Sequence, residues 1–426
     1  MTMIDWNSAD DMQRRAALAR PDVRGAPELR ARVTAIVEQV RDEGWPALER
    51  LATSIDGAPP KKVAVGPYAD KARETLGCEA IEAIELARAN IARFHRETLP
   101  RDTEVETMPG LTVAKRWLPL SSAGLYVPGG KAPLFSTLLM LAVPALVAGV
   151  QRLEVVTPPR ADGGLDPAVA YAAQLCGVET IRTVGGAQAI AALAFGAGEI
   201  RPVDRICGPG NAWVAAAKSI VSSLPGGPGV DLPAGPSELM VIADHSADPA
   251  VVAADLLSQS EHGPDAQSII VSNETSVIDR VLAEAGAMMD DMGGTFAPLR
   301  AIKCDTLETA CQIANAYAPE HLSLATQAAG RLVDRIVNAG AIFVGNRAAE
   351  TLGDYLAGSS HVLPTDGAAR YTGGVTSLTF MKSISIQRVT DDAARRLAAP
   401  AAVLARLEGL EAHARAAEIR ARKVDA

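Results

Sequence analysis

The sequence has little of what marks a disulfide-rich, zinc-thiolate or membrane protein. Its five cysteines are scattered and form no Cys-X-X-Cys pair, which argues against a disulfide framework and a thiolate zinc site. The most apolar run, residues 136–150, is broken by Pro144 and falls short of the roughly 18 residues that a membrane helix needs. The amino terminus has no basic segment followed by an apolar core, so no secretory signal is expected. We therefore expect a cytoplasmic protein in a reducing compartment.

Positive charge and aromatic side chains are also scarce. The 426 residues carry 41 Lys and Arg against 50 Asp and Glu, a formal net charge of -9 at pH 7. This balance argues against a general affinity for nucleic acid or acidic membrane surfaces. Aromatic residues make up 4% of a chain that is 48% hydrophobic, so its cores must consist mainly of Ala, Val, Leu and Ile. A globular protein with two lobes that acts on small molecules is favoured.

Strand and helix patterns alternate along most of the chain. A helical stretch over residues 27–54, interrupted near Pro46, and an amphipathic helix over residues 78–98 come first. Two alternating series follow, which predict parallel sheets covered by helices. The first contains strands 123–127, 153–157 and 180–184 and helices 138–149, 166–176 and 187–196. The second contains strands 239–243, 268–272, 323–326 and 341–344 and helices 249–262, 277–287, 306–317 and 330–338.

Two further segments bear on the domain organisation. Pro and Gly cluster without periodicity over residues 226–236, which predicts a boundary between two α/β lobes. After about Ser383 the chain is rich in Ala, Arg and Glu and is expected to be helical. This tail has little to form a core of its own, so we expect it to dock on another surface, such as a second subunit.

Three glycine-rich turns follow expected strands of the first series: Gly129-Gly130, Gly185-Gly186 and Gly208-Pro209-Gly210. Backbone NH groups in such turns can approach a phosphate, and the ends of strands are where α/β folds usually bind ligands. None of the turns has the Gly-X-Gly-X-X-Gly spacing, so the standard dinucleotide fingerprint is absent. Three turns within one lobe nevertheless favour a nucleotide or dinucleotide cleft.

Gln259 and His262 stand three residues apart at the end of an expected helix. Asp248 is a plausible N-cap, Pro249 takes the first helical position and Gly263 lies just past the end. At this spacing the two side chains share one helix face. An amide oxygen and an imidazole nitrogen can both coordinate a divalent metal. A helix end with a solvated histidine accounts for the same pattern, and the pair alone does not decide between the two.

Three of the other histidines follow a carboxylate in the sequence. Metal binding and proton transfer both use such groups, the carboxylate as hard ligand or base and the imidazole as ligand or proton carrier. The pairs are Glu320 with His321, Asp354 with His361, and Glu408 with His413.

Seven motifs, in this order along the chain, resemble those of a single family. They are GLYVPGGKAP from Gly124, VGGAQAIAALAFG from Val184, GPGNAWVAAAK from Gly208, DLPAGPSELMVIAD from Asp231, DLLSQSEHGPD from Asp255, APEHL from Ala318, and the segment from GDY at Gly353 to HVLPT at His361. The chain thereby resembles histidinol dehydrogenase nearly from end to end. The resemblance implies a zinc-dependent enzyme that oxidises L-histidinol to L-histidine through L-histidinal, with two NAD+ reduced.

The resemblance also implies roles for individual residues. Zinc, one ion per subunit, would be held by Gln259, His262, Asp354 and His413 of the partner subunit in a homodimer, with the substrate's nitrogens filling further positions. His321 would take the proton in alcohol oxidation, and Glu320 would activate the water that adds to the aldehyde. The remaining substrate contacts would be Ser237, His361 and Glu408 of the partner subunit, and the positions associated with NAD are Tyr126, Gln188 and Asn211.

For the fold, the resemblance implies two incomplete Rossmann-like α/β lobes in an aldehyde-dehydrogenase-like architecture, with helical extensions that intertwine a dimer. Residues 1–20 would be an amino-terminal extension. Residues 21–125 and 237–382 would form a discontinuous lobe with the zinc and acid/base residues. Residues 126–236 would form the NAD lobe, and residues 383–426 the helical tail that reaches the other subunit.

Two alternatives belong to different classes of function. A related zinc- and NAD-dependent dehydrogenase of another polar alcohol, such as a sulfonated diol, would share the ligands and the acid/base pair, although His361, Glu408 and His413 favour histidinol. A catalytically silent, metal-dependent nucleotide-binding protein is disfavoured because the acid/base pair and all four ligands are present. A cysteine-dependent aldehyde dehydrogenase is also disfavoured, because no cysteine lies in a loop that would lower its pKa.

Overall fold

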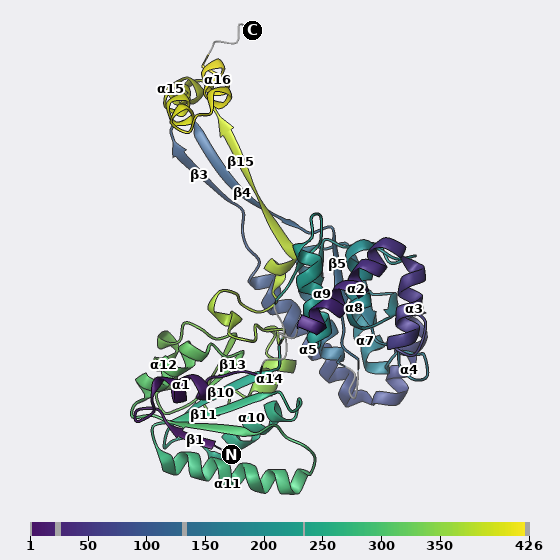
Figure 1. Ribbon diagram of the computed structural model, residues 1–426, viewed down its shortest axis with the longest axis vertical. Helices are drawn as coiled ribbons and strands as arrows, with labels where there is room; N and C mark the ends of the chain where they lie inside the picture. The colour runs from purple at the N-terminus through teal and green to yellow at the C-terminus, as the bar shows by residue number, and fades with distance from the viewer. Residues whose placement is uncertain (1, 22–26, 130–133, 233–234, 422–426) are drawn as a thin grey trace. The chain divides into compact units, whose positions relative to one another are not determined.

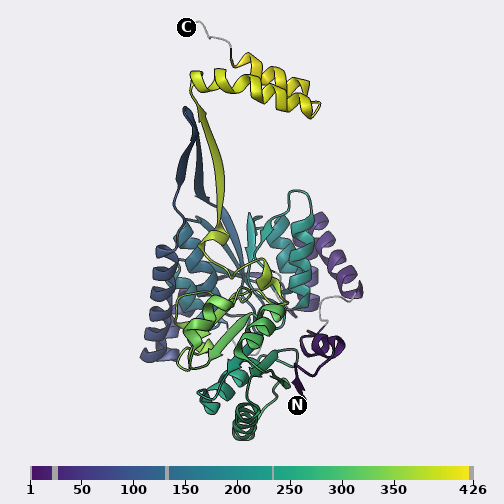
Figure 2. The ribbon, with the colours of Figure 1, turned by 90° about the vertical axis from the view of Figure 1, so that its left-hand side faces the viewer.

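The structure is a computed structural model that describes residues 2–21, 27–129, 134–232 and 235–421 (Figures 1 and 2). Gly130, in the first expected glycine turn, lies outside the described residues. The chain divides into two compact units, residues 1–98 with 120–380 and residues 99–119 with 381–426. Two six-stranded sheets belong to the first unit and a three-stranded sheet to the second. No described helix is long and apolar enough to cross a membrane.

One sheet of the first unit has the strand order β2-β7-β6-β5-β8-β9. All neighbours are parallel except β2, which runs antiparallel to β7. The chain moves from β5 outward to β6 and β7 and then returns to the other side of β5, so the order reverses between β5 and β8. In open α/β sheets such a reversal opens a crevice at the carboxyl ends of the strands. The strands are β2 Lys61–Ala64, β5 Ser122–Tyr126, β6 Arg152–Thr157, β7 Thr180–Thr183, β8 Arg205–Cys207 and β9 Gly229–Val230.

Eight helices pack with this sheet. Helices α2, α3, α8 and α9 share one hydrophobic core cluster with the sheet, while α6 contacts β5, α5 and α7, and α4 contacts α5 and α7. Asn211 caps α9, because its side chain accepts hydrogen bonds from the NH groups of Trp213 and Val214. The helices are α2 Pro27–Glu43, α3 Trp45–Ile55, α4 Gly66–Leu76, α5 Cys78–Glu97, α6 Phe135–Ala148, α7 Pro167–Leu175, α8 Gly186–Phe195 and α9 Ala212–Ser223.

The other sheet of the first unit has the order β1-β12-β11-β10-β13-β14, with every neighbouring pair parallel. Its central strands are fully buried, as expected for a sheet that is covered on both faces. Leu239 and Val241 point into the core under α10 and α11, and Met240 and Ile242 into the core under α12 and α13. The strands are β1 Thr2–Asp5, β10 Glu238–Ala243, β11 Gln267–Ser272, β12 Leu299–Lys303, β13 His321–Ala325 and β14 Ala341–Val344.

The helical segments that accompany this sheet are α1 Asp11–Ala17, α10 Pro249–Ser260, α11 Thr275–Met292, α12 Leu307–Tyr317, α13 Ala329–Leu332, η1 Val333–Arg335, α14 Glu350–Tyr355, η2 Ala368–Arg370 and η3 Ser377–Phe380. The segment over residues 330–338 was expected to be a longer helix. It forms one α turn and one 3-10 turn instead, and Ile336 is already extended.

The second unit is an antiparallel sheet, β15-β4-β3, followed by a pair of helices in contact with each other. Figure 2 shows the two helices side by side beyond the end of β15. Thr390 caps the first helix, and its backbone NH donates to the carbonyl of Gly110 in the turn between β3 and β4. The elements are β3 Thr103–Met108, β4 Leu111–Pro119, β15 Met381–Val389, α15 Asp391–Leu407 and α16 Glu411–Ile419.

The expected fold class, mixed α/β with two lobes built on mainly parallel sheets, is confirmed. The grouping of segments differs from the expected one. Residues 27–98 were assigned to the lobe that includes 237–382, but the apolar face of α2 (Val33, Val37 and Val40) is buried in the core cluster of α8 and α9. Helices α2 and α3 therefore pack with the sheet that contains β5.

The tail also differs from the expectation of a purely helical segment. Its first residues form β15, in which Ile384 and Ile386 alternate with polar residues, a pattern typical of a strand. Most of this strand is exposed, Ile384 included. The partners of this strand, β4 and β3, were not expected from the sequence. Residues 99–119 and the tail thus form one unit, although they are far apart in the chain.

Candidate active site

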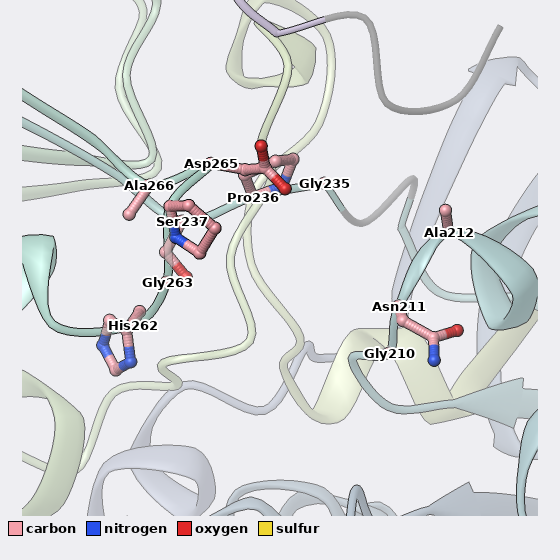
Figure 3. Close-up of a pocket in the computed structure, with 11 residues that line it drawn as sticks. Gly210, Asn211, Ala212, Gly235, Pro236, Ser237, His262, Gly263, Asp265 and Ala266 are labelled. Atoms are coloured by element: carbon pink, nitrogen blue, oxygen red, sulfur yellow. The ribbon is translucent and has the colours of Figure 1, made fainter. Parts of the chain in front are cut away.

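Most of the expected site residues of the first unit line one cavity of about 200 Å³. Its wall includes Ser237, His262, Glu320, His321, Asp354 and His361. A neighbouring cavity of about 300 Å³ shares Ser237 and His262 and extends to Asn211. Figure 3 shows Asn211 on the wall opposite His262 and Ser237. The six expected residues on the wall of the first cavity therefore come together although they are distant in the sequence.

Glu320 and His321 lie at the amino end of β13, which places them beside the first residues of β10. Helix α12 ends at Tyr317, and Ala318, the residue after it, adopts the left-handed conformation with φ of 56°. Pro319 follows and cannot continue the helix. The backbone NH of Glu238 then donates to Glu320 Oε2 at 2.9 Å. This tight turn therefore aims the Glu320 carboxylate back across the neighbouring strand.

His321 is held at Nδ1, while its Nε2 has no hydrogen-bond partner among the described residues. Its Nδ1 lies 3.2 Å from the carbonyl oxygen of Glu238 and 3.3 Å from Oε1 of Glu350, while its Nε2 lies 3.7 Å from Oδ1 of Asp354. The ring also stacks on Phe343, with 6.0 Å between the ring centroids. A carbonyl oxygen can only accept a hydrogen bond, so the proton of the neutral ring belongs on Nδ1 and the free lone pair on Nε2.

Burial shifts the ionisation of the acid/base pair in opposite senses. It lowers the pKa of His321 to about 3, and it raises the pKa of Glu320 well above its usual range. Removal from water disfavours the charged form in both cases. The imidazole is therefore neutral at pH 7 and able to accept a proton, and the carboxylate is a stronger base than an exposed glutamate.

Asp354 and His361 form a second linked pair on the cavity wall. The Nδ1 of His361 donates to the backbone carbonyl of Asp354 at 2.9 Å, so its Nε2 accepts from the hydroxyl of Thr137 at 3.3 Å. Thr137 belongs to α6, which packs on the other sheet. Burial raises the pKa of Asp354 to about 6. His361 thus links Asp354 to Thr137 of α6. The Asp354 carboxylate has no cationic partner among the described residues.

Gln259 and His262 lie where helix α10 ends, with one difference from the expected helix over 249–262. The helix stops at Ser260, and His262 lies in the turn beyond it, where its NH bonds to the carbonyl of Gln259. Gln259 is fully buried, and neither its amide oxygen nor its amide nitrogen has a hydrogen-bond partner among the residues that the structure describes. An unpaired buried amide costs about 1–3 kcal/mol, so this side chain is arranged for a partner of another kind.

A divalent metal is a partner that these groups fit. Gln259, His262 and Asp354 supply an amide oxygen, an imidazole and a carboxylate, a donor set that suits zinc. Within the described ranges, no three His, Cys, Asp or Glu side chains lie together so that they could hold a metal ion.

The three residues expected at NAD lie at the carboxyl edge of the sheet around β5. Asn211 follows β8 and lines the cavity wall. Tyr126 and Gln188 are buried: the Tyr126 hydroxyl accepts from the NH of Gly186, and the Gln188 amide donates to Asp56. Of the three, Asn211 therefore faces the cavity next to the acid/base pair.

Glu408 and His413 lie in the second unit, at the end of α15 and in α16, and both are exposed. Neither side chain makes a hydrogen bond or an ion pair with any described residue. The exposed apolar residues nearby are Val403, Leu404 and Leu407, which are 58%, 65% and 79% exposed. Exposed apolar side chains gathered near the end of one helix are typical of a surface that another chain covers.

Glu350 is a residue of the site that no sequence pattern indicated. It stands in Arg-Ala-Ala-Glu-Thr without a nearby histidine or glycine motif, yet it is 3% exposed and contacts His321. Burial and the neighbouring carboxylates of Asp354, Glu320 and Asp255 raise its pKa well above the usual range. Only the pairing of β13 with β14 and the position of α14 bring this residue to the site.

Gly340 provides a test of how tightly the Glu320 backbone is held. A Cβ atom at Gly340 would lie 2.5 Å from the carbonyl oxygen of Glu320. We expect Gly340→Ala to destabilise the protein by about 1–3 kcal/mol, as overpacking does, and to lower activity by moving Glu320. Urea unfolding and steady-state rates measure both effects. The control is Gly286→Ala in helix α11, which meets nothing within 4 Å. Unchanged stability and activity in Gly340→Ala would contradict the packing described for Glu320.

Known histidinol dehydrogenases match this protein in sequence and in structure over nearly the whole chain. The family model described as histidinol dehydrogenase matches residues 19–421. A histidinol dehydrogenase of Xylella fastidiosa is 42% identical over 427 residues, with 99% of each chain covered. One of Legionella pneumophila is 40% identical, over 99% of this chain and 98% of that relative. The crystal structure of histidinol dehydrogenase from Elizabethkingia anophelis is 36% identical and matches with a TM-score of 0.92 over 99% of this chain and 98% of the other. The chain belongs to the histidinol dehydrogenase family.

Proposed function

We propose that this protein oxidises L-histidinol to L-histidine through L-histidinal, with two NAD+ reduced and one zinc ion per subunit. The observation that carries the proposal is the pairing of a neutral, buried imidazole with a buried carboxyl on the wall of a small cavity. The chemistry removes two hydrides and adds one water. It therefore needs a base for each hydroxyl proton and a base for the water.

His321 is suited to the first oxidation. As the hydride leaves the alcohol carbon for the nicotinamide, Nε2 of His321 takes the hydroxyl proton and the C=O bond forms. The products are L-histidinal, NADH and one proton. Because burial holds the pKa of His321 at about 3, the ring enters the step neutral and passes its proton on readily. A well-placed base of this kind contributes roughly a hundredfold to ten-thousandfold to the rate.

Glu320 is suited to the hydration that follows. Its carboxylate takes one proton from water as the water oxygen bonds to the aldehyde carbon. The aldehyde oxygen takes up the proton that His321 accepted in the first step, which gives the hydrated aldehyde and returns His321 to its neutral form. His321 then accepts the proton of one hydrate hydroxyl while a second hydride leaves for the second NAD+, and the carboxylic acid is formed. Two adjacent bases are therefore needed. Glu320 accepts the proton of the attacking water, and His321 accepts the hydroxyl proton in each of the two oxidation steps.

Gln259, His262 and Asp354, with His413 of the partner subunit, would hold the zinc ion. When bound, zinc would orient the substrate through its amino and imidazole nitrogens, so that its contribution is proximity and orientation. The unpartnered amide of Gln259 supports this assignment, because a coordinating oxygen would satisfy it. The carboxyl groups of Glu320 and Asp354 on the cavity wall disfavour a sulfonate, which argues against the sulfonated diols.

For NAD+ we propose the crevice at the carboxyl ends of β5 and β8. The reversal of strand order lies there, and so does the amino end of α9, which favours a phosphate group. Asn211 would contact the dinucleotide directly. Tyr126 and Gln188 would shape the turn at Gly185 and Gly186 through their present hydrogen bonds.

We also propose a homodimer in which the tail of each subunit completes the site of the other. Glu408 of the partner subunit would contact the substrate, and His413 of the partner subunit would complete the zinc ligands. In support, both residues are exposed in a tail whose apolar side chains lack cover. Residues 383–426 would then be the segment that crosses to the partner, and β15 would begin it.

A substrate panel tests the proposed activity. Protein loaded with one zinc per subunit is expected to form NADH with L-histidinol and with L-histidinal, and none with 2,3-dihydroxypropane-1-sulfonate. Removal of zinc by a chelator should abolish the activity, and added zinc should restore it. NADH formation with the sulfonated diol but not with histidinol would replace the proposal with the related dehydrogenase.

A further inference from the structure

We propose that Glu350 is a positioning residue for His321: it holds the ring so that Nδ1 carries the proton and Nε2 is free to act as the base. The proposal rests on the proposed function, in which His321 accepts the hydroxyl proton. Neither the sequence nor the family resemblance assigned a role to this residue. The evidence is the arrangement of α14, β13 and β14 around one imidazole ring.

Helix α14 places one carboxyl group near each ring nitrogen of His321. Glu350 is the first residue of α14 and Asp354 follows one turn later, so both side chains lie on one face of the helix. Oε1 of Glu350 lies 3.3 Å from Nδ1, and Oδ1 of Asp354 lies 3.7 Å from Nε2. A single helical turn therefore sets both ends of the ring, while Phe343 from β14 supports its face.

Gly353 allows this close packing. A Cβ atom there would lie 2.6 Å from the ring of Phe343, so the residue between the two carboxylates has to be small. The ring of Phe343 can then lie between α14 and His321. Phe343 thus covers the face of the imidazole and two oxygen atoms face Nδ1, which holds the ring with Nε2 free.

The acceptors around Nδ1 decide which nitrogen is protonated. The carbonyl of Glu238 lies 3.2 Å away and Oε1 of Glu350 3.3 Å away. A lone pair on Nδ1 would face two oxygen lone pairs, whereas an N–H is shared favourably between them. When Nε2 takes the proton of the substrate, the carboxylate of Glu350 also lowers the energy of the positive ring. The aspartate of a Ser-His-Asp triad acts on its histidine in this way.

A double-mutant cycle distinguishes this role from a merely structural one. In zinc-loaded enzyme, Glu350→Gln is expected to lower kcat with L-histidinol by about tenfold to a hundredfold, less than the 10⁴ seen for a triad aspartate, because the Glu238 carbonyl still holds Nδ1–H. KM and zinc content should stay within about twofold. In a His321→Gln background the same change should have no further effect on kcat.

The control for the cycle is Glu85→Gln. Glu85 accepts a hydrogen bond from the buried Tyr171, elsewhere in the first unit, and does not line the cavity. Its substitution should leave kcat unchanged. An equal loss of kcat from Glu350→Gln in both backgrounds, or no loss in the wild-type background, would overturn the proposal.

A second measurement needs neither turnover nor a Glu350 variant. In zinc-loaded protein with ¹⁵N-labelled histidine, the six histidines give few enough signals for His321→Gln to assign the ring. We expect the proton on Nδ1 at neutral pH, and a proton on Nε2 would overturn the proposal. A wild-type protein that forms no NADH from histidinol would refute the proposed function, while this spectrum would still decide how His321 is held.

Discussion

Co-expression of two inactive variants, His262→Ala and His413→Ala, should restore about a quarter of the wild-type activity, because the mixture contains heterodimers with one intact site. In such a heterodimer the subunit with His262 intact would receive His413 of the partner subunit. The opposite site would lack both imidazoles. Random pairing makes half of the dimers mixed, and one of the two sites in each mixed dimer is intact. A quarter of all sites are therefore intact.

Each variant alone should lose more than about a hundredfold in activity, since loss even of groups behind a metal ligand costs tenfold to a hundredfold. His262→Ala should also lose zinc, because the remaining ligands from its own subunit are only Gln259 and Asp354. Zinc content is measured by atomic absorption. Activity is measured on the unselected mixture of dimers, where a quarter of the wild-type value is expected, and on mixed dimers purified through two different affinity tags, where half is expected.

The heterodimer result decides whether the site is shared between subunits. If His413 served the site of its own subunit, both sites of every mixed dimer would lack one ligand and the mixture would stay inactive. A matched control co-expresses His262→Ala with Gln259→Ala, two changes on the same side of the site. That pair should not complement, and activity from it would contradict the account.

Glu320→Gln should convert the enzyme into one that stops at the aldehyde. The amide can still accept the hydrogen bond from the Glu238 NH, so the backbone turn and the zinc site should persist. What it cannot do is take a proton from water. The hydration step should slow by roughly a hundredfold to ten-thousandfold, while oxidation of L-histidinol by His321 continues.

The experiment follows L-histidinol and L-histidinal separately. With Glu320→Gln, L-histidinol should give a first NADH and trapped L-histidinal, and added L-histidinal should be oxidised slowly. His321→Gln is the matched control, because loss of the common base should slow both oxidations. Oxidation of L-histidinal at the wild-type rate by Glu320→Gln would refute the role given to that carboxylate.

The sequence predicted the features that depend on local spacing. The helix that carries Gln259 begins at its expected N-cap, Asp248, and the buried strands β10, β11 and β13 appear as apolar runs. The pairs Glu320-His321 and Asp354-His361 also lie in one cavity wall. These predictions succeeded because helix caps and buried strands leave signals within a few residues.

Features that depend on long-range packing left no comparable signal. The acid/base pair lies at the amino end of β13, and helix α10 delivers Gln259 there because it runs back antiparallel to β10. Glu350 reaches His321 only through the pairing of β13 with β14. The burial that raises the pKa of Glu320 likewise comes from the assembled fold. A single sequence does not reveal such contacts, since each joins segments that are distant in the chain.

The most direct test of the central claim is the stoichiometry of the complete reaction. Zinc-loaded protein is given limiting L-histidinol and excess NAD+, and the NADH formed is counted against the histidinol consumed at the end point. We predict two NADH per L-histidinol, because each of the two oxidation steps transfers one hydride. One NADH per L-histidinol would mean that the reaction ends at the aldehyde and would contradict the paired roles of His321 and Glu320.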